Sequence, residues 1–113
     1  MITKIQTNQL LPTEEIIPSH LLEVEEALGL DTELWPPILV SEQNFILDGH
    51  HRHAIALEHD ISDLLAIVID YADENLQVVT YNEGVLLDKM TLLKIYETGV
   101  VLKAKTTRHL LKQ

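Results

Sequence analysis

Residues 45–53 are Phe-Ile-Leu-Asp-Gly-His-His-Arg-His, and they predict a strand that passes directly into a helix. The first three residues are apolar and indicate the strand, Asp48 and Gly49 interrupt it, and the helix is expected from His50 to about His59. The start of a helix presents free backbone N–H groups and a positive dipole end, which together attract phosphate. The stretch therefore predicts an anion-binding junction.

The individual residues of this junction leave several roles open. Gly49 allows the backbone to approach an oxyanion closely, and Asp48 could cap the helix, hold Mg²⁺ or orient a hydroxyl. Arg52 is expected in the first helical turn, where a cation opposes the dipole unless a bound phosphate lies beside it. Equally, Asp-Gly is a common turn, and the histidines could form a solvated surface. A dedicated metal site is disfavoured, because His50 and His53 alone supply too few ligands.

Apolar patterning predicts further elements on both sides of the junction. A turn over Ser41–Asn44 joins a strand at 38–40 to the strand at 45–47 in a hairpin. The apolar run 64–69 indicates a strand buried on both faces. The other predicted elements are strands at 2–5 and 76–81, a turn-rich crossing segment at 9–17, a helix from Pro18 that stops at Gly29, and a helix at 89–98 capped by Asp88 and closed by Gly99. The sum is a single α+β domain over residues 1–113, with a mixed β-sheet and packed helices.

The composition excludes several classes of protein. The chain has 113 residues, of which 46% are hydrophobic, no cysteine and a formal net charge of −10. Without cysteine it has no disulfide, no thiolate metal site and no cysteine nucleophile. The acidic balance disfavours nucleic acid and anionic membranes as partners. No apolar stretch is long enough to span a membrane, and the N-terminus does not resemble a signal peptide, so we expect a cytoplasmic protein.

Against this acidic background, cations gather in one further segment. Residues 103–109 are Lys-Ala-Lys-Thr-Thr-Arg-His, and hydroxyls beside lysine and arginine are groups that hold phosphate oxygens. On its own, the segment is more typical of a frayed basic tail. Nearer the N-terminus, Glu14 could act as a general base only if it lay beside a phosphate site. Trp35, which precedes two prolines, is expected to pack in the core or, alternatively, to form a wall for a nucleobase or substrate.

The junction and the C-terminal segment each resemble a motif of the free serine kinases, which belong to the ParB/sulfiredoxin-like superfamily. Residues 46–52 resemble the family's strand–Asp-Gly-His-His-Arg–helix element, and residues 105–109 closely resemble its Lys-Thr-Thr-Arg-His signature. Three weaker matches stand in the same order. They are residues 11–14 with the family's early Pro-x-Glu segment, 35–39 with its Trp-x-Pro strand entry, and 69–71 with the end of the strand after the motif helix.

The resemblance implies a kinase that transfers a phosphoryl group from ADP or ATP, with Mg²⁺, to the hydroxyl of free L-serine or a similar small hydroxyl metabolite. Glu14 would be the general base, and Asp48 would position that hydroxyl or the Mg²⁺. The residues implied for the nucleotide phosphates are Gly49, His50, His51, Arg52, Thr106, Thr107, Arg108 and His109. The residues implied for the substrate, including its carboxylate, are Trp35, His51 and Arg108.

One departure from the family leaves open which hydroxyl compound accepts the phosphoryl group and whether the chain catalyses the transfer. The serine kinases carry a sizeable second lobe between the strand end that residues 69–71 resemble and the Lys-Thr-Thr-Arg-His signature, where it forms part of the wall around the amino acid, whereas only residues 72–104 separate these two segments here. The phosphate-binding half of the resemblance therefore carries over better than the serine specificity. The alternatives are a non-catalytic ParB-like nucleotide-binding or regulatory module, which a preference for CTP would indicate, and an assembly protein that uses the fold as a scaffold. A homodimer is a further expectation.

Overall fold

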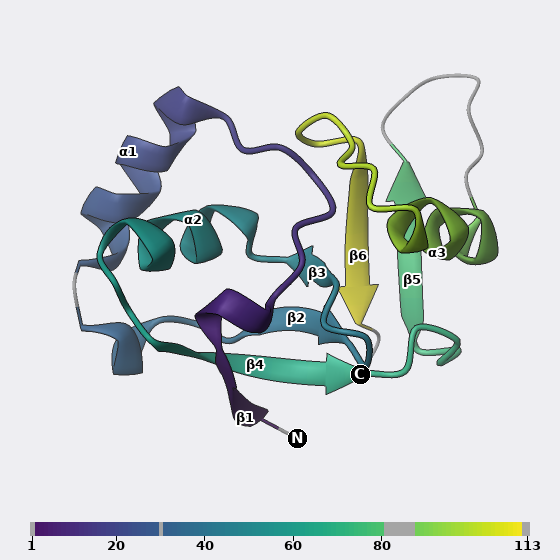
Figure 1. Ribbon diagram of the computed structural model, residues 1–113, viewed down its shortest axis with the longest axis horizontal. Coiled ribbons are helices and arrows are strands. Elements are labelled where there is room, and N and C mark those ends of the chain that lie inside the picture. The colour runs from purple at the N-terminus through teal and green to yellow at the C-terminus, as the bar shows by residue number, and fades with distance from the viewer. Residues whose placement is uncertain (1, 30, 81–87, 112–113) are drawn as a thin grey trace.

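The computed structural model describes residues 2–29, 31–80 and 88–111, which form a mixed sheet with helices packed around it (Figure 1). The described strands are β1 (Ile2–Gln6), β2 (Ile38–Ser41), β3 (Ile46–Asp48), β4 (Asp63–Ile69), β5 (Leu76–Thr80) and β6 (Thr107–Leu111). The described helices are α1 (Pro18–Leu28), α2 (His50–Glu58) and α3 (Lys89–Glu97), with short 3-10 helices η1 (Thr7–Gln9) and η2 (Thr32–Leu34). Within these ranges, no helix has the length and apolar character that a membrane crossing needs.

Four strands form one sheet in the order β1-β4-β2-β3. β2 and β4 run parallel, from Ile38 opposite Ala66 to Ser41 opposite Ile69, whereas the β1–β4 and β2–β3 pairs are antiparallel. Parallel neighbours need a crossover connection, and the chain passes through β3 and α2 before it returns as β4. The predictions of an α+β fold, a mixed sheet and a β2–β3 hairpin are therefore confirmed.

The sheet is buried on both faces, because alternate side chains of its strands serve two separate cores. Ile38 and Val40 of β2 belong to the core that includes residues of α1 and α2. Leu39 lies between them in the chain and belongs to the other core, which includes α3 and the β5–β6 pair. β4 divides in the same way, with Ala66 in the first core and Ile69 in the second. The prediction that the run 64–69 is buried on both faces is confirmed.

Gly49 makes the sharp change from β3 to α2 possible. Its φ of 112° lies in the left-handed region, and a Cβ atom at this position would overlap the side chain of Ile38 on β2. The predicted helix is confirmed from His50 to Glu58. Gly49 occupies the N-cap position, which removes helix capping from the roles that the sequence left open for Asp48.

The ends of the two flanking helices also agree with the sequence. α1 begins at Pro18, and its last turn closes where the Gly29 N–H donates to the Glu25 carbonyl at 3.1 Å. α3 follows Asp88, whose carboxylate accepts the Thr91 N–H at 2.8 Å. α3 ends at Glu97, one residue before the predicted end.

The C-terminal segment folds as strand β6, which the sequence analysis does not predict. β6 pairs with β5 in an antiparallel manner, with His109 opposite Val78 (Figure 1). Thr107 and His109 are buried, whereas Arg108 between them is exposed. A strand with polar inward positions lacks the apolar alternation by which strands are recognised, which is why this segment resembles a frayed tail. The prediction for β5 extends to Tyr81, which lies outside the described residues.

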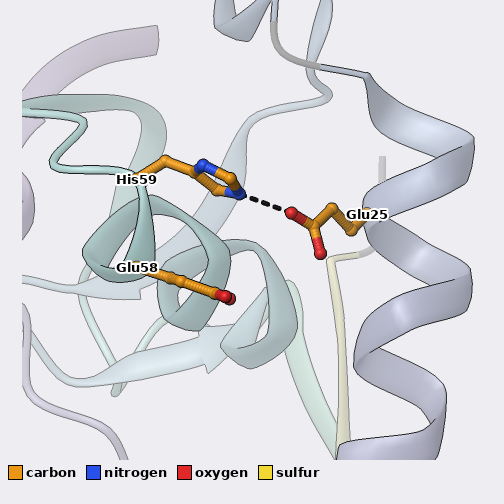
Figure 2. A group of neighbouring side chains, drawn as sticks. All are labelled: Glu25, Glu58 and His59. Carbon is orange, nitrogen blue, oxygen red and sulfur yellow. Dashed lines mark hydrogen bonds and ion pairs between the residues drawn. The ribbon is translucent and has the colours of Figure 1, made fainter.

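A side-chain hydrogen bond connects the C-terminal ends of α1 and α2. His59, directly after α2, hydrogen-bonds the Glu25 carboxylate of α1, and Glu58 extends beside this pair (Figure 2). One ligand-type atom from each of the three residues lies within 4.8 Å of the others. The contact fixes the position of α1 against α2, and α1 carries His20 and Val24 to the cavity described next.

Candidate active site

A cavity of about 710 Å³ lies between the start of α2, the start of α1 and the C-terminal segment. Its lining comes from three stretches that are far apart in the sequence. These are Glu14, Glu15, His20 and Val24 from the first, Leu47, Asp48, Gly49, His50, His51 and Arg52 from the second, and Ala104, Lys105, Thr107, Arg108 and His109 from the third. Residues of both sequence motifs and the acidic side chain of Glu14 therefore line one cavity.

Backbone hydrogen bonds join the N-terminal and C-terminal parts of this lining. The Glu15 N–H donates to the Leu102 carbonyl at 2.7 Å, and the Leu102 N–H donates to the Thr13 carbonyl at 2.9 Å. Glu14 and Leu102 therefore form a parallel bridge outside the named strands. This bridge places residues 104–109 beside the start of α2, which is how the basic segment reaches the cavity.

The Glu14 carboxylate is buried where these segments meet, with only 8% of the residue exposed. Its Oε1 accepts the Thr106 N–H at 3.2 Å, and its Oε2 accepts the Thr107 N–H at 3.2 Å. The Thr107 hydroxyl also donates to Oε2. An ionised carboxylate offers about four lone-pair sites, so Glu14 can still accept one further proton donor from the cavity.

His50 fixes the backbone of the same segment from the side of α2. Its Nε2 accepts the Thr13 N–H and the Glu14 N–H, each at 3.1 Å. The Nε2 atom is therefore unprotonated, and the proton of the neutral ring lies on Nδ1. Burial, with smaller contributions from His53 and His51, lowers the pKa of His50 to about 4. Of the imidazole of His50, only the Nδ1–H remains to donate to an anion.

The other two histidines of the motif hold neighbouring parts of the crossing segment. His51 Nε2 accepts the Ile17 N–H at 3.1 Å at the start of α1, and its ring lies edge-on to that of His20 with centroids 4.8 Å apart. His53 Nε2 contacts the Thr7 carbonyl at 3.1 Å and donates to it. Burial is the main cause that lowers the pKa of both rings. The alternative of a solvated histidine surface is wrong, because each ring is engaged by a different backbone group.

Arg52 is accounted for by protein contacts alone. Its Nη1 donates to the Pro36 carbonyl at 2.5 Å and to the Pro37 carbonyl at 3.1 Å, while its Nη2 lies 3.7 Å from Asp48 Oδ2. A bound phosphate is therefore not needed to explain a cation in the first turn of α2. The guanidinium still lines the cavity, where it can face an anion.

The exposed charges of the cavity lie at its rim. Asp48, Lys105 and Arg108 are all exposed lining residues, as is Glu15. Lys105 adopts a left-handed φ of 59° in the turn before β6. Mobile cations at a rim can reach phosphate or carboxylate oxygens of a bound molecule.

His109 contributes a neutral ring to the cavity rather than a charge. It is buried on β6, its Nε2 lies 2.9 Å from the Tyr71 hydroxyl, and its ring packs near Tyr71 and Tyr96. Burial lowers the pKa of His109 to about 4, although the Leu47 carbonyl raises it slightly. Its expected contact with phosphate stays a prediction.

Two residues selected from the sequence are not brought to the cavity. Trp35 is buried in the core under α1 and α2, and its Nε1–H donates to the Gly29 carbonyl at 3.1 Å, so the packing alternative is confirmed and the substrate-wall expectation is wrong. The Thr106 hydroxyl is turned to the Lys103 carbonyl at 2.6 Å, and only its N–H serves the site, through Glu14. Conversely, His20 and Val24 line the cavity without having been selected. Their spacing of four residues places them on one face of a helix, which is the pattern that could have revealed them.

No protein-family model matches the sequence. The chain is 33% identical over 87 residues to an ATP-dependent L-serine kinase of Staphylothermus marinus, in an alignment that covers 73% of this chain and 34% of that protein. It is 32% identical over 98 residues to a ParB-like protein of Sulfolobus acidocaldarius, which covers 85% of this chain and 49% of that protein. The chain therefore spans between a third and a half of the length of these curated relatives.

Solved structures show the same fold. A free serine kinase with a Glu-to-Ala mutation, in complex with ADP, superposes with a TM-score of 0.82 over 97% of this chain and 87% of that chain, at 15% identity. The sheet and helices of this chain thus form the same α+β fold as the free serine kinase. With the two sequence relatives, they make the chain a member of the serine kinase/ParB-like superfamily.

Proposed function

We propose that this chain is a kinase that binds ADP or ATP in the cavity and transfers a phosphoryl group to the hydroxyl of free L-serine or a similar small hydroxyl metabolite. The observation that carries the proposal is the meeting of Glu14 with the start of α2 and with Lys105 and Arg108 of the basic segment in one cavity. Relatives named as ATP-dependent L-serine kinases support the reaction class, and ATP as donor.

Phosphoryl transfer depends mainly on alignment and on neutralisation of charge. In the proposed reaction, the acceptor hydroxyl oxygen forms a bond to the terminal phosphorus of the nucleotide. The bond between that phosphorus and the bridging oxygen breaks, and the nucleotide leaves with one phosphate fewer. Glu14 accepts the hydroxyl proton. The backbone N–H groups at the start of α2, with Arg52 and Arg108 at its sides, neutralise charge on the phosphates.

Mg²⁺ fits the rim of the cavity at Asp48. The Asp48 side chain is 67% exposed, and its ion pair with Arg52 is a long one of 3.7 Å, which leaves the carboxylate accessible to a hydrated cation. When bound, Mg²⁺ would neutralise charge on the donor phosphates. In the same proposal, Asp48 holds the cation or orients the acceptor hydroxyl, and the nucleobase lies against apolar lining such as Val24 and Ala104.

The amino-acid end of the acceptor would meet the exposed rim. Arg108 is a cation free to extend over the cavity and suits a substrate carboxylate, while the Nδ1–H of His51 offers a second donor. His50, Thr107 and His109 contribute through the hydrogen bonds described above. A homodimer stays a prediction, which sedimentation of the purified chain tests.

A second candidate function is a ParB-like module that binds a nucleotide without turnover. The observation that favours it is the 32% identity to a ParB-like protein over most of this chain. The same cavity would then hold a nucleoside triphosphate, and the acidic net charge of −10 argues against a bound duplex in this chain.

Calorimetric titration with ADP, ATP and CTP, each with Mg²⁺, separates the two candidates. The kinase proposal expects binding of an adenine nucleotide, followed by formation of O-phosphoserine when L-serine is added. L-alanine is the matched control, because it lacks only the hydroxyl and should yield no phosphorylated product. A preference for CTP, with no transfer to any of a panel of small hydroxyl compounds, would overturn the kinase proposal in favour of the second candidate.

A further inference from the structure

We infer that Thr107 is a positioning residue that orients the Glu14 carboxylate for proton transfer, rather than a ligand of the nucleotide phosphates. The inference rests on the proposed kinase function. It assigns to Thr107 a role different from the phosphate contact that the family resemblance implies for it.

The first support is the direction of the Thr107 hydroxyl. A hydroxyl has one proton to donate, and that of Thr107 is donated to Glu14 Oε2. Its remaining lone pairs are acceptors and cannot bind an anionic phosphate oxygen. The residue is buried, with 7% exposed, so its hydroxyl does not turn freely into the cavity.

The second support is the way in which the rest of Glu14 is fixed. Its N–H is held by His50 Nε2 at 3.1 Å, and its backbone lies in the bridge to Leu102. The main chain is therefore anchored from two sides, and the rotation of the carboxylate is the freedom that remains. The Thr106 N–H holds Oε1, and Thr107 restricts the rotation at Oε2 with two donors, its N–H and its hydroxyl.

The third support is the contrast between two adjacent threonines. Thr106 donates only its backbone N–H to Glu14, while its hydroxyl bonds the Lys103 carbonyl at 2.6 Å. The hydroxyl of Thr107 is thus the side-chain donor to Glu14 among the described residues. It holds Oε2, and the carboxylate keeps one lone-pair site for the incoming hydroxyl proton.

The test compares Thr107→Val with Thr107→Ser in turnover and in nucleotide affinity. Thr107→Val keeps the size of the side chain and removes the donor, and a misdirected base should lower kcat by about 10- to 100-fold. The dissociation constant for the nucleotide, measured by calorimetry, should stay within about twofold, because no phosphate contact is lost. Thr107→Ser keeps the hydroxyl and should restore kcat. Thr98→Val, which removes a threonine hydroxyl bonded to the Ile95 carbonyl of α3, is the control for the substitution itself.

A double-mutant cycle with Glu14→Gln provides a readout that a purely structural role would not produce. If Thr107 acts through Glu14, then Thr107→Val should have little further effect on kcat in the Glu14→Gln background. A weakened nucleotide affinity with unchanged kcat would identify Thr107 as a phosphate ligand and overturn the inference. So would unchanged kcat in Thr107→Val, or equal effects in both backgrounds. If Thr107→Val fails to fold, Thr107→Ala takes its place in the cycle. Absence of turnover in the wild-type chain is a separate result, which refutes the proposed function instead.

Discussion

His50 Nε2 accepts the backbone N–H of Glu14 at 3.1 Å, so a histidine of the helix motif directly fixes the segment that carries the proposed base. The Thr13 N–H donates to the same nitrogen at the same distance. Both bonds need an unprotonated Nε2. The motif thus serves the site twice, because the helix start offers N–H donors to an anion while the imidazole holds the acidic side chain in place.

Acid should destabilise the folded chain through its buried histidines. Burial lowers the pKa of His50 and that of His109 from 6.5 to about 4. Both rings bind protons more readily in the unfolded chain, so their contribution to stability is complete above pH 6.5 and is lost as the pH falls through about 4. Each contributes on the order of 3 kcal/mol to the free energy of unfolding. Urea unfolding across this pH range measures the loss.

The matched variant for this prediction is His50→Gln. A glutamine oxygen can accept the two N–H groups near the position of Nε2 but does not titrate. The stability of His50→Gln should therefore fall less steeply than that of the wild type between pH 6.5 and about 4. An identical pH dependence for the two proteins would show that His50 is not the group responsible.

Gly49→Ala should destabilise the chain more than Gly29→Ala. Both glycines have a positive φ, 112° and 68° respectively, and a side chain in such a backbone conformation costs about 1–3 kcal/mol. A Cβ at Gly29 meets open space, whereas one at Gly49 overlaps Ile38 and adds about 1–3 kcal/mol of overpacking. Thermal and urea unfolding of the two variants gives the comparison. Equal costs would contradict the close approach of the junction to β2.

Arg52→Ala should weaken nucleotide binding and also lower stability. The side chain faces the cavity, and it donates two hydrogen bonds to the carbonyls of Pro36 and Pro37, whose loss costs about 1–3 kcal/mol of unfolding free energy. Arg108→Ala is the comparison, because Arg108 is exposed and should lose nucleotide affinity with little change in stability. Calorimetry and urea unfolding measure the two quantities. Wild-type nucleotide affinity in Arg52→Ala would limit this residue to a structural role.

Local sequence predicts the elements of this fold well where apolar side chains follow a regular period. The run 64–69 and the Asp-Gly junction both have the structure that their patterns indicate. The sequence does not predict β6, because its inward side chains have polar partners that are distant in the chain. Thr107 bonds Glu14, and His109 contacts Tyr71. A pattern within a short stretch of sequence cannot indicate a partner that is distant in the chain.

In the site, too, the residue types could be predicted from the sequence, whereas the long-range contacts could not. The sequence indicates which residue types suit phosphate, and the structure brings them to one cavity. The sequence does not indicate that His50, His51 and His53 each hydrogen-bond a backbone group of residues 7–17. Nor does it indicate that Arg52 hydrogen-bonds two proline carbonyls. These contacts depend on how α2 lies across the crossing segment, which is a property of the assembled fold.

The most direct test of the account follows O-phosphoserine by phosphorus NMR in a mixture of the chain, ATP, Mg²⁺ and L-serine. We expect the wild-type chain to form the product and Glu14→Gln to form it about 10²- to 10⁴-fold more slowly, with nucleotide affinity almost unchanged. Product formation by Glu14→Gln at the wild-type rate would contradict the assignment of the base, and no product from the wild type would contradict the proposed reaction.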